Sequence, residues 1–263
     1  MSTLNPTATA ASSTIPSTTV SNGPTAESPT GKSATGKSAT AKSVPGSRFW
    51  NWYAKFYGNV ERLVPHQTMI QDLIGLIPAD ANRILDVGCG SGQLLANLRQ
   101  QRPDAALYGI DYSEVMLAKA TNRVTELHAS KADLNQRLPF PDDHFDCLVS
   151  SNVIYAVTDP AALAAEMRRV TRPGGRVIVS SPKRIASGRR ILISHCRSVG
   201  VVRGAFDLAN FSVCMLPNML IERLGKGRGY HFMKKQQVQS LSPGCKIYPD
   251  TFAGQNWLFT LVD

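Results

Sequence analysis

A glycine-rich turn between a strand and a helix constrains the fold of this chain more than any other feature. Residues 85–93 read Leu-Asp-Val-Gly-Cys-Gly-Ser-Gly-Gln; they follow the apolar residue Ile84, and a helical pattern begins at Gln93. Glycine allows the unusual backbone of such a turn, and it lets a ligand approach backbone N–H groups at the start of a helix. The sequence therefore predicts an α/β fold with a ligand site at the end of a strand.

The details of the turn bear on which ligand it would hold. Gly88 and Gly90 fit the dinucleotide-binding pattern, but Gln93 stands where that pattern has a small residue, and Gly92 comes one position early. Asp86 lies two residues before the first glycine. A carboxylate at that place suits a ligand with an ammonium group and suits a pyrophosphate poorly. A tight turn without any ligand is the alternative that this segment alone leaves open.

Further segments follow in a regular order. A second apolar strand, 106–110, ends in Asp111, where one carboxylate can accept hydrogen bonds from both hydroxyls of a ribose. A plain helix cap is the alternative role for Asp111. The later segments are Ala132-Asp133-Leu134, the stretch 138–146, a strand at 145–150, a helix at 159–170, and Arg172-Pro173-Gly174-Gly175 turning into a strand at 176–181.

In this order and spacing, the segments resemble the class I S-adenosylmethionine-dependent methyltransferases, in particular the methyltransferase type 11 branch that resembles ubiquinone and menaquinone methyltransferases. The resemblance covers about residues 80–182. It implies an α/β, doubly wound, mostly parallel seven-stranded sheet of the Rossmann-like methyltransferase fold, with a helical cap insertion before the last two strands. Those two strands are expected at 245–248 and 257–262.

The resemblance also implies S-adenosyl-L-methionine as the cofactor and assigns residues to it. The glycine turn would hold the amino-acid end, with Asp86 supporting the ammonium, and Asp111 would take the ribose hydroxyls. Tyr112 and Met116 would flank the adenine, and Asp133 would accept a hydrogen bond from the adenine amino group. The expected cofactor-binding residues are Asp86, Gly88, Cys89, Gly90, Gly92, Asp111, Tyr112, Met116, Asp133, Leu134 and Ser151.

The residues expected to face the methyl acceptor are fewer. An aromatic segment, 49–58, reads as a helix that closes over the site, and within it Tyr53 and Tyr57 are expected to contact the substrate. The alternative is that these rings only pack the helix onto the sheet. Asn152 lies just past the fourth strand, without the Asn-Pro-Pro-Tyr motif of amino-directed nucleic-acid methyltransferases. No catalytic base is assigned; Tyr155 and His195 are the candidates.

Composition divides the chain into two parts. Residues 1–47 are rich in Ser, Thr and Ala with few large apolar side chains, so we expect a disordered tail. A formal P-loop match at 31–38 lacks the flanking strand and helix and is rejected. The methyltransferase domain is expected at 48–263, with an N-terminal helical cap at 48–80 and a basic, apolar cap insertion at 182–240.

Charge is concentrated in the second cap. Residues 182–235 contain eleven Lys and Arg residues against two acidic residues, and the whole chain has a net charge of +10. A basic and apolar cap suits an amphiphilic or anionic substrate, or peripheral contact with an anionic membrane surface. A solvated basic face is the alternative. Nucleic acid is disfavoured because aromatic residues do not alternate with the charges.

The other composition signals concern compartment and metal. The five cysteines are scattered and form no Cys-x-x-Cys pair, so we expect reduced thiols in the cytoplasm and no metal. No apolar stretch reaches transmembrane length. The acid-poor N-terminal segment also fits an organelle transit peptide, and organelle targeting stays open.

Transfer of a methyl group to a small molecule is therefore the expected function, with a lipid-like, quinone-like or anionic acceptor. Two alternatives stay open: a nicotinamide-dependent oxidoreductase, and a non-catalytic protein that binds S-adenosylmethionine. The sequence determines neither the acceptor atom (O, N or C) nor the oligomeric state.

Overall fold

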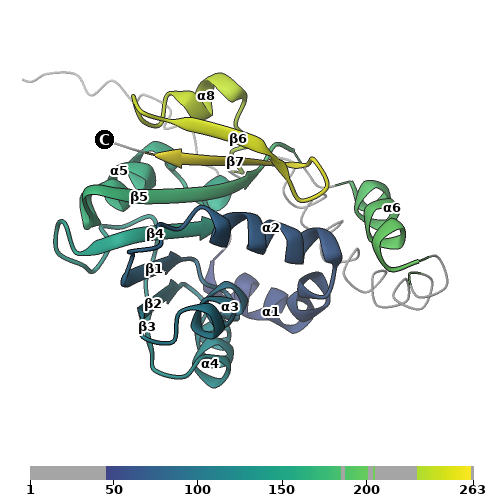
Figure 1. Ribbon diagram of the computed structural model, residues 1–263, viewed down its shortest axis with the longest axis horizontal. Helices are drawn as coiled ribbons and strands as arrows, with labels where there is room; N and C mark the ends of the chain where they lie inside the picture. Colours follow the sequence, from purple (N-terminus) through teal and green to yellow (C-terminus); the bar gives the residue numbers. More distant parts are fainter. Residues whose placement is uncertain (1–45, 185–186, 201–203, 205–229, 262–263) are drawn as a thin grey trace, which may run out of the picture. The chain divides into compact units, whose positions relative to one another are not determined.

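A computed structural model of the chain contains one seven-stranded sheet in the order β3-β2-β1-β4-β5-β7-β6 (Figure 1). It describes residues 46–184, 187–200, 204 and 230–261. The strands are β1 (Arg83–Val87), β2 (Ala106–Asp111), β3 (Leu127–Lys131), β4 (Phe145–Ser151), β5 (Thr171–Pro182), β6 (Lys246–Thr251) and β7 (Asn256–Leu261). Neighbours among β1–β5 pair in parallel, whereas β7 runs antiparallel to β5 and β6. The expected mostly parallel, doubly wound sheet is confirmed.

Helices cover both faces of the sheet because its central strands are apolar on both faces. Ile84 belongs to the core under α2, α3 and α4, whereas Leu85 and Val87 belong to the core under α5 and α8. All three side chains are fully buried. Successive residues of a strand point to opposite faces, so a continuous apolar run is what a doubly covered sheet requires. The helices are α1 (Ser47–Glu61), α2 (Val64–Gly75), α3 (Gln93–Gln101), α4 (Glu114–Arg123), α5 (Pro160–Val170), α6 (Gly188–Val199), α8 (Lys235–Gln239) and the 3-10 helix η1 (Ile154–Ala156).

Two helices begin at side-chain caps that the sequence signals. Ser113 Oγ accepts a hydrogen bond from the Met116 N–H at 3.2 Å at the start of α4. Asp159 accepts from the N–H groups of Ala161 at 2.9 Å and Ala162 at 3.1 Å at the start of α5. These bonds satisfy donors that the first turn of a helix leaves unpaired, and each cap fixes where the chain leaves a strand or loop.

Two strands differ from the sequence prediction. The stretch 172–175 is a bulge inside β5 and not a turn before it, because Phe145 pairs with Thr171 and Cys147 then pairs with Arg176. A Cβ on Gly175 would lie 2.8 Å from the carbonyl oxygen of Asp146, which explains a glycine there. Strand β3 was not predicted, since it is a half-exposed edge strand without a regular apolar alternation.

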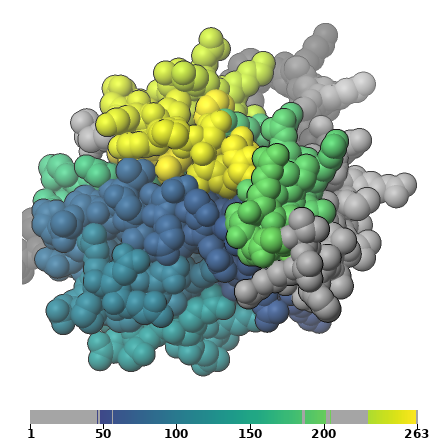
Figure 2. All heavy atoms as spheres, turned by 45° about the vertical axis from the view of Figure 1, so that its right-hand side comes forward, coloured from purple at the N-terminus to yellow at the C-terminus, as the bar shows by residue number. Residues whose placement is uncertain are grey.

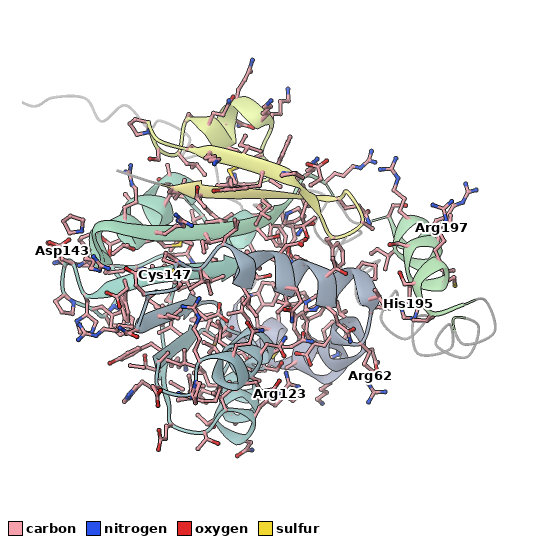
Figure 3. All side chains as sticks on the ribbon, viewed as in Figure 1. Arg62, Arg123, Asp143, Cys147, His195 and Arg197 are labelled. Atoms are coloured by element: carbon pink, nitrogen blue, oxygen red, sulfur yellow. The ribbon has the colours of Figure 1, made fainter. Side chains whose placement is uncertain are left out.

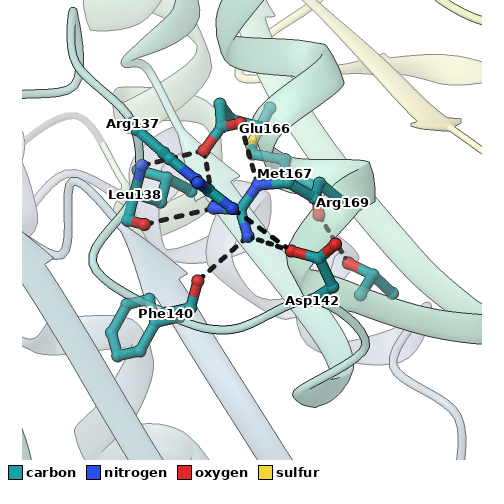
Figure 4. A network of polar contacts seen from close by, with 8 residues as sticks. Arg137, Leu138, Phe140, Asp142, Glu166, Met167 and Arg169 are labelled. Carbon is teal, nitrogen blue, oxygen red and sulfur yellow. Dashed lines mark hydrogen bonds and ion pairs between the residues drawn. The ribbon is translucent and has the colours of Figure 1, made fainter. Parts of the chain in front are cut away.

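The stretch 138–146 is held by α5 (Figure 4). Arg169 donates to the carbonyl oxygens of Leu138 at 3.1 Å and Phe140 at 3.0 Å. The same guanidinium pairs with Asp142 and Glu166, each at 2.7 Å. Most of this motif of the sequence therefore serves to anchor a loop on a helix.

The end of that motif, Asp146, joins the starts of two strands. Its Oδ2 accepts from the backbone N–H groups of Asn82 at 2.9 Å and Arg83 at 2.8 Å, and its Oδ1 accepts from Arg172 Nε at 2.7 Å. Burial raises the pKa of Asp146, but these hydrogen bonds outweigh it and hold the pKa below its usual value. Asp146 acts at the amino edge of the sheet, where β1 and β4 begin.

Two expectations fall largely outside the described residues. Residues 1–45 contain nearly all of the predicted tail, and residues 185–186, 201–203 and 205–229 contain much of the predicted basic cap insertion. The proposed domain boundaries thus stay predictions. Within the described ranges, no helix is long and apolar enough to cross a membrane, and no cluster of three His, Cys, Asp or Glu side chains could hold a metal ion.

Candidate active site

A pocket of about 970 Å³, including its open mouth, lies at the carboxyl ends of β1, β2 and β4. Helix α1 forms its opposite wall, and Figure 1 shows this helix beside the ends of the parallel strands. The carboxyl edge of a parallel sheet is the usual place for a ligand in such folds. The lining residues are Gly46, Trp50, Tyr53, Tyr57, Gly88, Gly90, Asp111, Tyr112, Met116, Asp133, Leu134, Asn135, Ser151, Asn152, Val153, Ala156 and Val157.

The glycine turn contributes backbone, and its three glycines have different surroundings. Gly88 has φ +77°, and a Cβ on it would lie 2.3 Å from Cγ2 of Val153, so only glycine fits between β1 and the loop after β4. Gly90 also lines the pocket. Gly92 lies outside it; a Cβ there would lie 2.9 Å from Cβ of Ala120, so this glycine lets α3 approach α4.

Two carboxylates reach the pocket from neighbouring strands. Asp111, at the end of β2, accepts the Gly90 N–H at 2.9 Å and the Ser113 N–H at 2.8 Å. Burial raises the pKa of Asp111, and these backbone hydrogen bonds partly oppose it. Asp133, after β3, accepts from the backbone and side-chain nitrogens of Asn135 at 3.0 Å and 2.9 Å. The Asp111 carboxylate is therefore hydrogen bonded to the glycine turn, the Asp133 carboxylate to its own loop, and both line the same pocket.

Two buried oxygen atoms at this edge have no protein partner. Asp86 is 3% exposed, and its Oδ1 has no hydrogen-bond partner in the described part of the chain. Burial, and then the charge of Asp111, raises the pKa of Asp86 to about 8. Ser151 Oγ is likewise buried without a partner, and Ser151 lines the pocket. Since buried polar atoms are normally paired, these two are available for the polar groups of a ligand.

Helix α1 is fastened to the rest of the site by polar contacts along its length. Asn51 Oδ1 accepts from Ser113 Oγ at 2.5 Å, and the carbonyl of Ala54 accepts from Lys119 Nζ at 2.6 Å. At its end, Glu61 is hydrogen bonded to Ser91 of the glycine turn. Arg123 of α4 donates to Glu61 Oε2 at 3.0 Å and to Ser91 Oγ at 2.9 Å. The wall of the pocket and its glycine turn are thereby joined directly.

A group of polar side chains holds the lining residue Asn152. This residue has φ +58°, an uncommon backbone for a residue other than glycine. Asn256 Nδ2 of β7 donates to Asn152 Oδ1 at 2.6 Å and to Ser180 Oγ at 2.9 Å, and the sulfur of Met69 lies 3.7 Å from Asn152 Nδ2. The Asn152 N–H also donates to the Ser180 carbonyl at 2.9 Å, so α2, β5 and β7 hold Asn152 in place at the end of β4.

Most of the predicted site residues come together in this pocket, and some do not. Eleven of them line it, eight of the cofactor set and the three substrate residues Tyr53, Tyr57 and Asn152. Asp86, Cys89 and Gly92 are not among the lining residues; the sulfur of Cys89 lies 3.0 Å from the position of a Cβ on Gly109. The roles of all these residues stay predictions.

The two candidate bases lie outside the lining. His195 of α6 is 3% exposed and its Nδ1 accepts the Val64 N–H at 3.2 Å, so it joins α6 to the start of α2 (Figure 3). Tyr155 stacks on Tyr230 and Phe232, with ring centroids 5.5 Å and 5.7 Å away. Burial raises the pKa of Tyr155 well above its usual value, which disfavours a phenolate.

Six lining residues were not anticipated from the sequence: Gly46, Trp50, Asn135, Val153, Ala156 and Val157. Asn135 follows the Asp133 motif by two residues, and its Oδ1 accepts the Thr158 N–H at 2.7 Å. Val153, Ala156 and Val157 belong to the loop that follows Asn152. Asn135, Val153, Ala156 and Val157 each adjoin a predicted segment. Extending those segments by a few residues would therefore have found four of the six.

Comparisons with known proteins agree with this geometry. Residues 85–179 match the family model for the methyltransferase domain. Over 138 residues the chain is 31% identical to the ubiquinone/menaquinone biosynthesis C-methyltransferase of Geobacter sulfurreducens, covering 49% of this chain and 54% of that protein. Over 108 residues it is 37% identical to a phosphatidylethanolamine N-methyltransferase of Cereibacter sphaeroides, covering 39% of this chain and 52% of that protein.

The extent of these matches is partial. The chain spans 34% to 54% of the length of the first four curated relatives it matches. Among solved structures, an S-adenosylmethionine-dependent methyltransferase from Thermotoga maritima superposes with a TM-score of 0.52 at 18% identity, covering 81% of this chain and 96% of that one. At this identity the likeness concerns the fold, and it confirms the Rossmann-like methyltransferase architecture.

Proposed function

We propose that the chain transfers a methyl group from S-adenosylmethionine to a small molecule, because residues 85–179 match the family model for the methyltransferase domain. S-Adenosylmethionine carries a methyl group that its sulfonium already activates. The protein must then hold the acceptor in line with that methyl group and keep water out. The observation that carries the proposal is the pocket itself, where a glycine turn and two carboxylates meet at one sheet edge.

The residues present fit this cofactor. Asp86 Oδ1 is buried without a partner, and an ammonium group would satisfy it. Asp111 lies at the end of β2, where its carboxylate would accept hydrogen bonds from a ribose diol. The apolar side chain of Met116, in the same lining, would pack against an adenine. Gly88 leaves room that any Cβ would fill. In this proposal Asp86, Asp111 and Met116 hold the amino-acid, ribose and adenine parts.

Charge supports this cofactor over a nicotinamide dinucleotide. Among the described lining residues, Asp111 and Asp133 are acidic and none is Lys, Arg or His. Asp86, two positions before the lining residue Gly88, has a pKa of about 8, and a bound ammonium group would favour its charged form. Such a pocket attracts a cationic sulfonium and ammonium, and it repels the two negative charges of a pyrophosphate. We therefore favour methyl transfer over hydride transfer.

The wall opposite the glycine turn favours a neutral acceptor with an aromatic or apolar part. Trp50, Tyr53 and Tyr57 line the pocket from α1, and Tyr53 lies 5.7 Å from Tyr57 between ring centroids. Aromatic rings pack well on flat or apolar groups. Since no described lining residue is cationic, a quinone-like or lipid-like acceptor fits better than an anionic one.

One experiment separates the alternatives. Purified protein is titrated with S-adenosylmethionine and with NADH, and is then incubated with methyl-labelled cofactor and fractionated cell extract. We expect binding of the first ligand only, and label in a lipid or small-molecule fraction. Binding of NADH would support an oxidoreductase. Tight S-adenosylmethionine binding with no labelled fraction would support a non-catalytic binding protein, and label only in protein or nucleic acid would refute the acceptor class.

We further propose that α6 contacts an anionic membrane surface. Arg189, Ile193 and Arg197 are spaced by four residues and all are exposed, so they share one outward face, while Ile191 and His195 are buried. Figure 2 shows α6 at the molecular surface beside β6 and β7. An exposed apolar residue between two arginines is the pattern of an interfacial helix.

Sedimentation with vesicles tests this contact. Vesicles that contain phosphatidylserine should bind the chain, and vesicles of phosphatidylcholine alone should bind it weakly. Replacing Arg189 and Arg197 with Gln should weaken binding by about thirtyfold, since each basic residue near such a surface contributes about 1 kcal/mol. Replacing the exposed Arg137, which lies outside α6, serves as the matched control. Equal binding to both vesicle types would refute the contact.

A further inference from the structure

The last strand of the sheet contacts the pocket wall through one buried amide. Asn256 begins β7, is 1% exposed and lies outside the pocket lining. Its Nδ2 donates to Oδ1 of the lining residue Asn152 at 2.6 Å and to Oγ of Ser180 at 2.9 Å. Both hydrogens of this amide nitrogen are therefore used, one of them on a residue 104 positions earlier in the chain.

A buried thioether determines the direction of these hydrogen bonds. Met69 of α2 is fully buried. Its sulfur lies 3.5 Å from Asn256 Nδ2, 3.7 Å from Asn152 Nδ2 and 3.3 Å from Ser180 Oγ. A thioether sulfur can accept a hydrogen bond but cannot donate one, so the amide nitrogens, and not the amide oxygens, belong beside it. Turning both amides over would place two oxygens against the sulfur. Asn256 is therefore the donor, and Asn152 Oδ1 is the acceptor.

Asn152 depends on such contacts because of its backbone. Its φ of +58° lies in the left-handed region, which residues with a Cβ adopt uncommonly. A backbone of this kind persists where the surrounding structure holds it. The Asn152 N–H donates to the Ser180 carbonyl at 2.9 Å, and Asn256 donates to the Asn152 side chain. The main chain and the side chain of Asn152 are thus both bonded to β5 and β7.

The neighbours of Asn152 connect this backbone to the glycine turn. Ser151 and Val153 line the pocket together with Asn152 itself. Val153 packs directly on the turn, since a Cβ on Gly88 would collide with its side chain. Residues 151–153 therefore form the part of the wall next to the glycine turn. A change in the backbone of Asn152 would move Ser151 and Val153 relative to that turn.

We propose that Asn256 is a positioning residue for methyl transfer: by donating to Asn152, it keeps residues 151–153 in place beside the glycine turn. This inference rests on the proposed function. Methyl transfer needs the acceptor in line with the sulfonium methyl, and a displacement of about 1 Å can lower a rate about a hundredfold. Asn256→Leu should therefore lower the transfer rate by about tenfold to a hundredfold. S-Adenosylmethionine affinity should fall less than about threefold, because Asp86 and Asp111 lie on other strands.

The isosteric variant Asn256→Asp gives a readout that a packing role would not change. The new carboxyl can donate to Asn152 Oδ1 when it is protonated, and it can only accept when it is ionised. Transfer of labelled methyl groups to the extract fraction that wild type labels is measured from about pH 5 to about pH 9, where a buried carboxyl titrates. Dividing by the wild-type rate removes shared titrations such as that of Asp86. We expect this ratio to fall at least about tenfold as pH rises, and the ratio for Asn256→Leu to stay constant.

A double variant tests whether Asn256 acts through Asn152, without any ligand. Glycine adopts the left-handed backbone readily, so in Asn152→Gly the contact from Asn256 is no longer needed. In urea unfolding, Asn256→Leu should therefore destabilise Asn152→Gly much less than it destabilises wild type. Circular dichroism at each pH confirms that the single variants used in the rate measurements are folded.

A matched control lies one residue earlier in the chain. Gln255 is 2% exposed and outside the pocket lining, and its Oε1 accepts from the Ser187 N–H. Gln255→Glu adds a buried carboxyl beside Asn256, and it should leave the transfer rate within about twofold of wild type at every pH. An equal pH dependence in both carboxyl variants, a constant ratio in Asn256→Asp, or additive losses in the double variant would overturn the inference. A wild type that labels no fraction would instead overturn the proposed function itself.

Discussion

Replacing Gly88 with alanine tests whether the glycine turn is required for space or only for its backbone angle. Gly88 and Gly174 have nearly the same φ, +77° and +75°, but a Cβ on Gly88 would lie 2.3 Å from Val153 Cγ2, whereas a Cβ on Gly174 would meet nothing within 4 Å. The two substitutions thus share the backbone strain and differ in the collision. Gly174 is the matched control.

The magnitudes follow from these two contributions. A left-handed backbone costs an alanine about 1–2 kcal/mol, and the lower entropy of the unfolded chain returns about 0.4–1 kcal/mol. We therefore expect Gly174→Ala to lower the free energy of unfolding by about 1 kcal/mol. The collision adds about 1–3 kcal/mol of overpacking, so Gly88→Ala should lose about 2–4 kcal/mol.

A double variant isolates the collision. Val153→Ala removes both Cγ atoms, so Gly88→Ala combined with Val153→Ala should show a favourable coupling of about 1–3 kcal/mol in urea unfolding. Gly88 and Val153 both line the pocket, so Gly88→Ala should also weaken S-adenosylmethionine binding by about tenfold or more, with partial recovery in the double variant. Equal losses for Gly88→Ala and Gly174→Ala, together with zero coupling, would refute the steric explanation.

Three further predictions concern the groups around the pocket. The pKa of Asp86 is about 8 in the folded chain against 3.8 in the unfolded chain, so between these pH values the folded state binds more protons and the free energy of unfolding should fall as pH rises from about 4 to 8. In Asp86→Asn, the free energies of unfolding measured in urea at pH 5 and pH 8 should differ much less than in wild type. An unchanged dependence of this free energy on pH would contradict the prediction. Arg123→Met leaves the buried Glu61 carboxylate without its cation and should cost about 3 kcal/mol in urea unfolding, whereas Arg137→Met at an exposed ion pair should cost under about 1 kcal/mol. Ser113→Ala removes the cap of α4 and the contact to Asn51, and should cost about 1–2 kcal/mol by thermal unfolding, more than Thr121→Ala inside the same helix.

The sequence predicted those parts of the molecule that depend on local pattern. The glycine turn, Asp111 and Asp133 are each tied to the end of one strand, and a parallel sheet brings such ends to one edge. The caps at Ser113 and Asp159 are local for the same reason. The order of these motifs along the chain was therefore enough to predict eleven of the residues that line the pocket.

The parts that were missed depend on contacts between distant residues. His195 looked like a base because of its residue type, yet its role depends on Val64, 131 residues earlier in the chain. The contact of His66 on α2 with Tyr57 on α1 likewise joins two helices, so no local pattern signals it. Strand β3 was missed because pairing with β2, and not apolar alternation, makes it a strand. Pattern alone cannot supply such tertiary relations.

The fastening of α1 has a consequence for how this site can change in evolution. The helix precedes the first strand, and it is tied to α4 and the glycine turn through Asn51, Ala54 and Glu61. Its pocket-facing residues, Trp50, Tyr53 and Tyr57, are not among those ties. Substitutions on that face can thus alter acceptor selectivity while the anchoring residues, and the strand ends opposite, stay as they are. The architecture separates the residues that anchor α1 from those that face the acceptor, so that the acceptor wall can change without rebuilding the sheet.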